Sequence, residues 1–347
     1  MKALFWLPHL RRFLGVFSFL LIGLGSSSAW ALTCQTSSGA TQFTEPIGNV
    51  SVPDTVPDGT IIWISPTRTT SGTCKKSASD SVNLATVDHI YFYSLQGSPR
   101  AIYPGDPSTW GIDISIRYNG AEYPLSEISG VAGNGLFTGF TLPPCSLADY
   151  NRGVCFINVS ITYQIVIRKH GLSPFVHPTQ DLFSLFQFDG QLGINSTQAS
   201  YQYILSGMSN IVGTACTVDV KVTPEPGVVD FGEVQAVPGG FSPSRPTKPF
   251  NLALDKSCST SIKVSGYFET SNAVQNNLLL PAADSNFGIS IQNQNGVQVP
   301  IREPFLLGTF SPTQTQMDVP MTASLVPLGT PKIGPFSATA TILILYD

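Results

Sequence analysis

The sequence has little charge. Asp, Glu, Lys and Arg make up only 12% of its 347 residues. The 18 basic and 22 acidic side chains leave no basic excess, which excludes a broad electrostatic surface for nucleic acid. Apolar residues make up 42% of the chain, too many for a disordered protein. So few charges, among many Ser, Thr, Asn and Gln, favour short strands with polar turns over long surface helices.

The sequence also lacks an apolar run long enough to span a membrane. Residues 13–25 form an uncharged, mostly apolar run of thirteen, short of the ~20 that a spanning helix needs. Lys2, Arg11 and Arg12 precede this run, and an Ala-x-Ala sequence ends at Ala31. Together they predict an export signal over residues 1–31, cleaved after Ala31. Cleavage leaves 15 basic and 22 acidic side chains, a formal charge of −7.

No Cys-x-x-Cys pair occurs, which excludes the usual zinc-ribbon and thioredoxin-like sites. All six cysteines follow the predicted cleavage point, and an even number in an oxidising compartment predicts disulfides. Six cysteines allow fifteen sets of pairings. Pairing each cysteine with its neighbour in sequence gives Cys34–Cys74, Cys145–Cys155 and Cys216–Cys258, and the sequence leaves the pairing of the four N-terminal cysteines open.

Motifs of enzymes are missing as well, since no Gly-x-Ser-x-Gly, His-Glu-x-x-His or Walker sequence is present. His170, His177 and Asp181 are the one grouping that resembles metal ligands, but their spacing matches no known pattern. We therefore expect no catalytic residues, metal or cofactor. A secreted polysaccharide-acting enzyme with an immunoglobulin-like accessory domain remains as an alternative.

What is present is a series of β-branched and aromatic runs bounded by Pro, Gly or Asn. They predict strands at residues 61–64, 90–93, 112–118 and 156–167, with a single helical turn near 146–152. A small polar stretch at 207–214 predicts a linker between an N-terminal domain of residues 32–206 and a C-terminal domain of residues 215–347. Both domains are expected to be all-β.

In the C-terminal part the pattern predicts strands at residues 216–222, 228–234, 250–254, 262–268, 287–291, 317–326 and 336–346. The last of these places six apolar residues on one face: Phe336, Ala338, Ala340, Ile342, Ile344 and Tyr346. Because its end is apolar on both faces, it belongs inside a sheet. No sequence remains to cover it, so either the N-terminal domain or another chain must supply a missing strand.

These residues resemble the pilin domain of chaperone–usher fimbriae. The matching motifs are Cys216-Thr217-Val218, Val229-Asp230-Phe231-Gly232-Glu233-Val234 and Gly334-x-Phe336-x-Ala338-x-Ala340. The resemblance implies an immunoglobulin-like domain that lacks its last strand and has Cys216 bonded to Cys258. It also implies a groove formed by Val218, Val220 and the apolar face of the last strand. In this family a periplasmic chaperone fills the groove first, and the donor strand of the next pilin subunit then replaces it at the outer-membrane usher.

Cys34 is only the third residue after the predicted cleavage point, which leaves no free donor arm. A subunit that accepts a strand but cannot donate one belongs at the fibre end, and two-domain subunits of that kind are tip adhesins on the cell surface. The N-terminal half is similar to type 3 (MrkD-like) fimbrial adhesins through Gly48-Asn49-Val50-x-Val52-Pro53 and the early cysteine. The resemblance implies a β-sandwich or jelly-roll-like receptor-binding domain.

The expected receptor is a host or surface molecule, either a collagen-like matrix protein or a glycan. Aromatic rings and guanidinium groups on loops are the best candidates for contact with such ligands. Arg68 leads because it is expected in the polar loop before Cys74, followed by Arg100, Tyr103 and Trp110 in a Pro/Gly-rich stretch. A subunit that initiates the fibre without binding a receptor is a further alternative.

Overall fold

The computed structural model describes residues 32–77, 81–171, 178–194 and 199–347, so the predicted signal segment lies outside the described residues. The described chain is almost wholly strands, which confirms the all-β prediction. Its helical turns are α2 (Ser81–Ala85), α3 (Leu147–Asn151), η1 (Pro107–Trp110) and η2 (Met208–Asn210). Within these ranges, no helix is long and apolar enough to cross a membrane.

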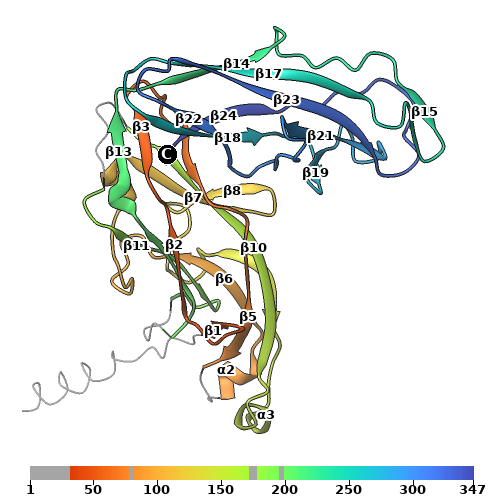
Figure 1. The fold of residues 1–347 in the computed structure, drawn as a ribbon. Helices are drawn as coiled ribbons and strands as arrows, with labels where there is room; N and C mark the ends of the chain where they lie inside the picture. The colour runs from red at the N-terminus through yellow and green to blue at the C-terminus, as the bar shows by residue number, and fades with distance from the viewer. Residues whose placement is uncertain (1–31, 78–80, 172–177, 195–198) are drawn as a thin grey trace, which may run out of the picture.

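The first half of the chain forms a β-sandwich (Figure 1). One sheet has the order β1 (Leu32–Thr36), β5 (Arg68–Lys76), β10 (Phe156–Lys169), β7 (Ile112–Tyr118) and β8 (Ala121–Pro124), with β4 (Ile61–Ile64) also paired to β10. The facing sheet has the order β2 (Gln42–Pro46), β12 (Gln202–Ser206), β11 (Leu182–Asp189), β6 (Asp88–Ser94) and β9 (Leu136–Leu142).

Aromatic rings fill the space between these two sheets. The rings of Phe92 and Phe186 lie 5.1 Å apart, and Tyr163 of the opposite sheet packs edge-on 5.4 Å from Phe186. Ile112, Ile114 and Ile116 of β7 are all buried, as their alternation predicts. The N-terminal module therefore has a core of its own.

The stretch predicted as a linker is structured. Residues 207–214 form η2 and β13 (Ile211–Thr214), and β13 pairs in parallel with β3 (Val50–Pro53). Met208 and Ile211 are fully buried. The small polar residues around them predict an exposed stretch instead. Instead of running free between the domains, the stretch packs onto the N-terminal module.

The C-terminal module is a second sandwich. Its larger sheet has the order β14 (Val218–Thr223), β17 (Thr247–Lys256), β23 (Gln316–Pro327), β21 (Phe287–Asn293), β20 (Leu278–Leu279) and β19 (Val274–Gln275). The smaller sheet has the order β22 (Phe305–Phe310), β18 (Ile262–Glu269) and β24 (Thr341–Tyr346), and β15 (Gln235–Val237) and β16 (Gly240–Ser242) form a separate hairpin. The six cysteines form the bonds Cys34–Cys74, Cys145–Cys155 and Cys216–Cys258.

The two modules meet at the C-terminal end of the chain (Figure 1). Leu345 of β24 and Tyr267 of β18 are buried in one cluster with Ile61, Ile64 and Val166 of the N-terminal module. The N-terminal module therefore covers the second apolar face of β24.

Polar contacts reinforce this junction. The Arg117 guanidinium of β7 donates hydrogen bonds to Tyr267 Oη, at 2.5 Å, and to a Glu269 carboxylate oxygen, at 3.0 Å. Burial raises the pKa of Tyr267 to about 12, so its hydroxyl stays protonated and neutral at physiological pH. The contact between modules thus combines an apolar cluster with a charged hydrogen-bond donor.

Candidate functional site

Two segments that the sequence predicts as strands pair with no neighbouring strand. Residues 228–234 have no strand, and the last strand begins at Thr341 instead of at Phe336. Both strand predictions are wrong, because neither segment forms a backbone ladder with a neighbouring strand. The predicted alternation of side chains is nevertheless present. Phe336, Ala338 and Ala340 are half-buried, while Ser337 and Thr339 are exposed. An isolated extended segment is not a β-strand until a neighbour bonds to its backbone.

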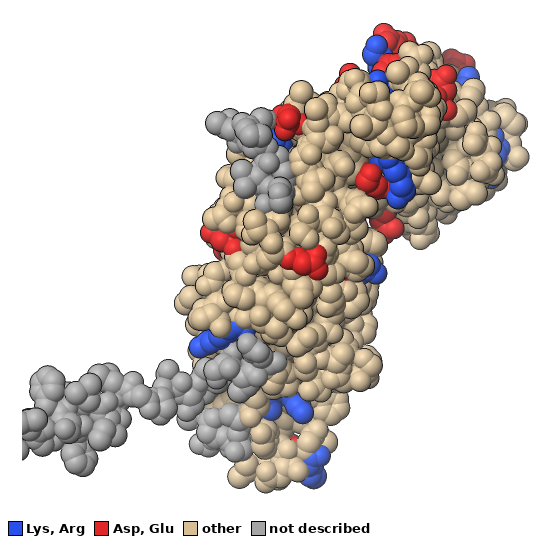
Figure 2. Space-filling model, turned by 60° about the vertical axis from the view of Figure 1, so that its left-hand side comes forward, with Lys and Arg blue, Asp and Glu red and all other residues tan. Residues whose placement is uncertain are grey.

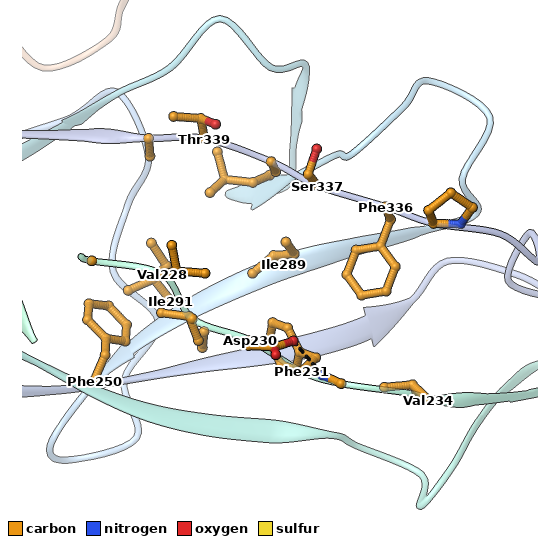
Figure 3. Close-up of a pocket in the computed structure, with 18 of the residues that line it drawn as sticks. Val228, Asp230, Phe231, Val234, Phe250, Ile289, Ile291, Phe336, Ser337 and Thr339 are labelled. Atoms are coloured by element: carbon orange, nitrogen blue, oxygen red, sulfur yellow. Dashed lines mark hydrogen bonds between the residues drawn. The ribbon is translucent and has the colours of Figure 1, made fainter. Parts of the chain in front are cut away.

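These two segments form the walls of one groove (Figure 3). The groove encloses about 950 Å³. Val228 and Phe231 line one wall, Phe336 lines the other, and Ile289 and Ile291 of β21 lie on the floor. The lining is predominantly apolar, and an apolar groove between two extended backbones fits an extended peptide with alternating apolar side chains.

One end of the groove is filled by aromatic rings. Phe336 packs edge-on against Phe287, with ring centroids 5.1 Å apart, and lies 6.3 Å from Phe231. Phe241 of β16 also packs edge-on against Phe287, with ring centroids 5.4 Å apart. Val228 and Ile333 remain 61% and 88% exposed at the rim, so apolar surface there is left open to solvent.

The predicted groove residues separate into two groups. Phe336, Ala338, Ala340 and Ile342 line the groove. Val218, Val220, Ile344 and Tyr346 instead pack in the core of the C-terminal module and are not part of the lining. There the Tyr346 hydroxyl donates a hydrogen bond to Val218 O, at 3.1 Å, and accepts one from Val218 N, at 3.0 Å. The C-terminal sandwich is therefore closed where Tyr346 meets Val218 and open along the groove.

Arg68 lies at the start of β5, not in the loop where the sequence places it, and its guanidinium is fixed by a buried partner. It donates two hydrogen bonds to Glu45, at 2.6 and 2.7 Å, and Glu45 is only 2% exposed. The hydrogen bond to Glu45 is the main cause of the raised pKa of Arg68. The guanidinium also stacks over the Phe43 ring, 5.6 Å from its centroid.

Arg68 lines a shallow hollow of about 580 Å³. Seven hydroxyl-bearing residues line it as well: Thr36, Ser37, Ser38, Thr67, Thr69, Thr70 and Ser71. Tyr163 and Tyr201 lie at its base, where their hydroxyls share hydrogen bonds with Thr70 at 2.8 and 3.3 Å. The hollow therefore combines many hydroxyl groups, the rings of Phe43, Tyr163 and Tyr201, and a guanidinium whose charge Glu45 balances.

The other predicted receptor contacts do not join this hollow. Trp110 is 8% exposed and packs edge-on against Phe183, so it is a core residue; this prediction is wrong because η1 turns the ring inward. The Arg100 guanidinium donates to Ile194 O. Tyr103 is 37% exposed beside β11, where its backbone N–H donates to Ser184 Oγ.

The histidine grouping does not assemble within the described residues. His170 lies 2.9 Å from Asp113, Asp181 accepts a hydrogen bond from Ser209, and His177 falls outside the described ranges. In the described part of the chain no three His, Cys, Asp or Glu side chains gather as metal ligands would. The face shown in Figure 2 carries scattered charges of both signs rather than a patch of one sign.

Several solved structures are similar to this chain. The CupB6 tip adhesin from Pseudomonas aeruginosa is 15% identical, over 91% of this chain and 93% of that chain, with a TM-score of 0.24. A chaperone–tip subunit complex of the Csu pili of Acinetobacter baumannii is 14% identical over 90% and 100%, with a TM-score of 0.24. A chaperone–usher pilus is 15% identical over 38% and 87%, with a TM-score of 0.28. Scores this low establish no shared overall arrangement.

A family model gives the stronger result. The model described as fimbrial protein matches residues 206–347, a range that contains both walls and the floor of the groove. Fimbrial proteins are structural subunits, so the match gives no support to the alternative of an enzyme with an accessory domain. The C-terminal module of this chain is thus similar to the domain that the fimbrial-protein model describes.

Proposed function

We propose that this protein is the tip adhesin of a chaperone–usher fimbria. Its C-terminal domain accepts a donor strand in the groove, and its N-terminal domain binds a receptor. The observation that carries the proposal is the pair of facing apolar segments, residues 228–234 and 331–340, that lack strand partners on either side of the groove. One inserted strand supplies hydrogen bonds to both segments at once.

The donor belongs to another chain. The N-terminal module covers the Leu343 and Leu345 face of β24, on the side away from the groove. No strand of the described chain enters the groove itself. We infer that a periplasmic chaperone fills it first and that the next pilin subunit fills it after transfer at the outer-membrane usher.

The first strand and the predicted cleavage site support a position at the tip. After cleavage behind Ala31, the chain begins at Leu32 inside β1, and Cys34 is bonded to Cys74. These residues are held in the N-terminal sandwich, so they are not available as a donor arm. We propose that the protein passes through the periplasm and stands at the fibre tip, with one domain of residues 32–214 and another of residues 215–347.

For the receptor, the hollow beside Arg68 favours a neutral glycan over a charged ligand. Its hydroxyl groups offer donors and acceptors to sugar hydroxyls, and the ring of Phe43 offers an apolar face. Glu45 already balances the charge of Arg68, so an anionic sugar gains little there. A matrix protein remains the second candidate because Phe43 also suits an apolar peptide side chain.

Acceptance of a donor strand is tested by introducing a charged side chain into the groove. We expect Ala338→Asp to abolish co-purification with a fimbrial chaperone, because it places a carboxylate among apolar lining residues. Ser337→Asp is the matched control, since the Ser337 side chain is exposed on the opposite face of the same segment. Both variants are co-expressed with the chaperone in the periplasm and recovered by affinity purification. Equal recovery of the two would contradict the proposal.

Receptor binding is tested at Phe43, which is 36% exposed. We expect Phe43→Ala to weaken binding to a neutral glycan about tenfold, because it removes the ring that covers the sugar face. Phe137→Ala, at a ring 43% exposed on β9, is the control and should bind normally. The measurement is a glycan array combined with a panel of matrix proteins. Binding only to matrix proteins, or an equal loss in both variants, would exclude the hollow as a glycan site.

A further inference from the structure

The first residue of β1 lies in an unusual environment for a chain end. Leu32 is fully buried, and its backbone nitrogen lies 3.1 Å from Asp189 Oδ1. Asp189, the last residue of β11, is also fully buried. Because β1 and β11 belong to opposite sheets, this contact joins the two halves of the N-terminal sandwich.

Asp189 is held in place by further hydrogen bonds. Its Oδ1 also accepts from Gly190 N at 2.8 Å, and its Oδ2 accepts from Gln187 Nε2 at 2.7 Å. Gln187 in turn accepts from Gln202 Nε2 at 2.9 Å. The three donors named here, including Leu32 N as an amide, are uncharged. A charged donor would bind a buried carboxylate more strongly than a neutral one.

Other charged side chains are buried near Asp189. Among the described residues, the buried charged side chains at this end of the sandwich are Asp189, Asp88 and Lys76, two carboxylates and one ammonium. Asp88 lies beside Gly190, and Lys76 pairs in register with Leu32 across β1 and β5. A positive charge on a donor to Asp189 would strengthen the hydrogen bonding of this carboxylate.

Signal cleavage after Ala31 provides such a charge at the required atom. In the uncleaved chain the Leu32 nitrogen is a neutral amide, and after cleavage it becomes an α-ammonium with three donor hydrogens. We propose that removal of the signal segment creates a buried ion pair between the Leu32 α-ammonium and Asp189. The N-terminal domain then reaches its full stability only when the chain starts at Leu32. The inference depends on the cleavage position and not on strand acceptance by the groove.

The experiment compares four chains, which differ in the first residue and in the side chain at position 189. The mature chain beginning at Leu32 is compared with a chain that keeps Ala31, each with Asp189 or with Asp189→Asn. Trp63 and Trp110 are the sole tryptophans that remain after cleavage, so tryptophan fluorescence in the full chain reports the N-terminal domain alone. The state of the groove therefore does not affect the result.

We expect Asp189→Asn to lower the melting temperature of the mature chain by roughly 10 °C and to have a clearly smaller effect when Ala31 is present. Asp58→Asn, at an exposed position of the same domain, should change neither. An equal loss from Asp189→Asn in both chains would overturn the proposal, because the carboxylate would then act only through neutral donors.

A second measurement applies even if Asp189→Asn fails to fold. The native full chain is treated with an amine-acetylating reagent and analysed by mass spectrometry. We expect the Leu32 α-amine to react only after unfolding, whereas the exposed Lys248 reacts in the native state. An N-terminus other than Leu32, or one that reacts as readily as Lys248, would contradict the ion pair.

Discussion

Appending a pilin donor peptide after Asp347 through a flexible linker is expected to raise the melting temperature of the C-terminal domain by about 10–20 °C. A strand that buries about five apolar side chains contributes roughly 8–15 kcal/mol before the cost of ordering the donor is subtracted. The groove has apolar walls to receive these side chains, and residues 228–234 and 336–340 have backbone groups to bond to the donor. Calorimetry of the full chain without chaperone measures the gain.

The control is a donor of the same length in which the alternating apolar residues are replaced by Asn. It should give neither the thermal shift nor the higher soluble yield, because it cannot fill the groove. If the chain without any donor already has the same yield and melting temperature, the sandwich closes by itself and the domain is not an acceptor of strands.

Removal of the Cys216–Cys258 bond is expected to have the second-largest effect. This bond joins the residues beside β14 and β17, two strands paired from Val218 with Lys256 to Thr223 with Asn251. Loss of a native disulfide from an exported domain typically costs about 2–5 kcal/mol. We expect the double substitution Cys216→Ala with Cys258→Ala, made in the donor-complemented chain, to lower the melting temperature of the C-terminal domain by about 10 °C.

The same sample contains an internal reference. Tryptophan fluorescence reports only the N-terminal domain, so that transition should stay in place while the calorimetric transition of the C-terminal domain shifts. Free thiols at Cys216 and Cys258 in the native protein, or an unchanged calorimetric transition after the double substitution, would show that the bond has no structural role.

Local sequence patterns predict those parts of the fold that depend on neighbouring residues. The alternation from Ile112 to Tyr118 predicts β7, and Ser146 before a short helical run predicts the turn at α3. Pairing cysteines by proximity gives the same three bonds as the structure. The strand and the helical turn are decided within a short stretch of chain, whereas the cysteine pairs are separated by 10 to 42 positions.

The walls of the groove show where this reasoning fails. Residues 228–234 and 336–340 have the side-chain pattern of strands, and Phe336, Ala338 and Ala340 do face the same way. Whether they form strands depends on a hydrogen-bonded neighbour, which the pattern cannot reveal. The errors in predicting secondary structure therefore coincide with the site itself.

Contacts between distant residues could not be predicted from the sequence. Glu45 fixes Arg68 from another sheet, and Asp189 lies 157 positions from Leu32. The Pro and Gly residues around Trp110 predict a surface ring, yet η1 turns it against Phe183. Such pairings depend on tertiary packing, for which a single sequence carries no periodic signal.

Hydrogen–deuterium exchange tests the central claim most directly. It is measured on the full chain with and without the appended donor peptide, with peptides that cover residues 228–234 and 336–340. If the groove accepts a strand, both segments exchange freely without the donor and become protected together when it is present. Protection of both segments before any donor is added, or no change when it is added, would contradict the account.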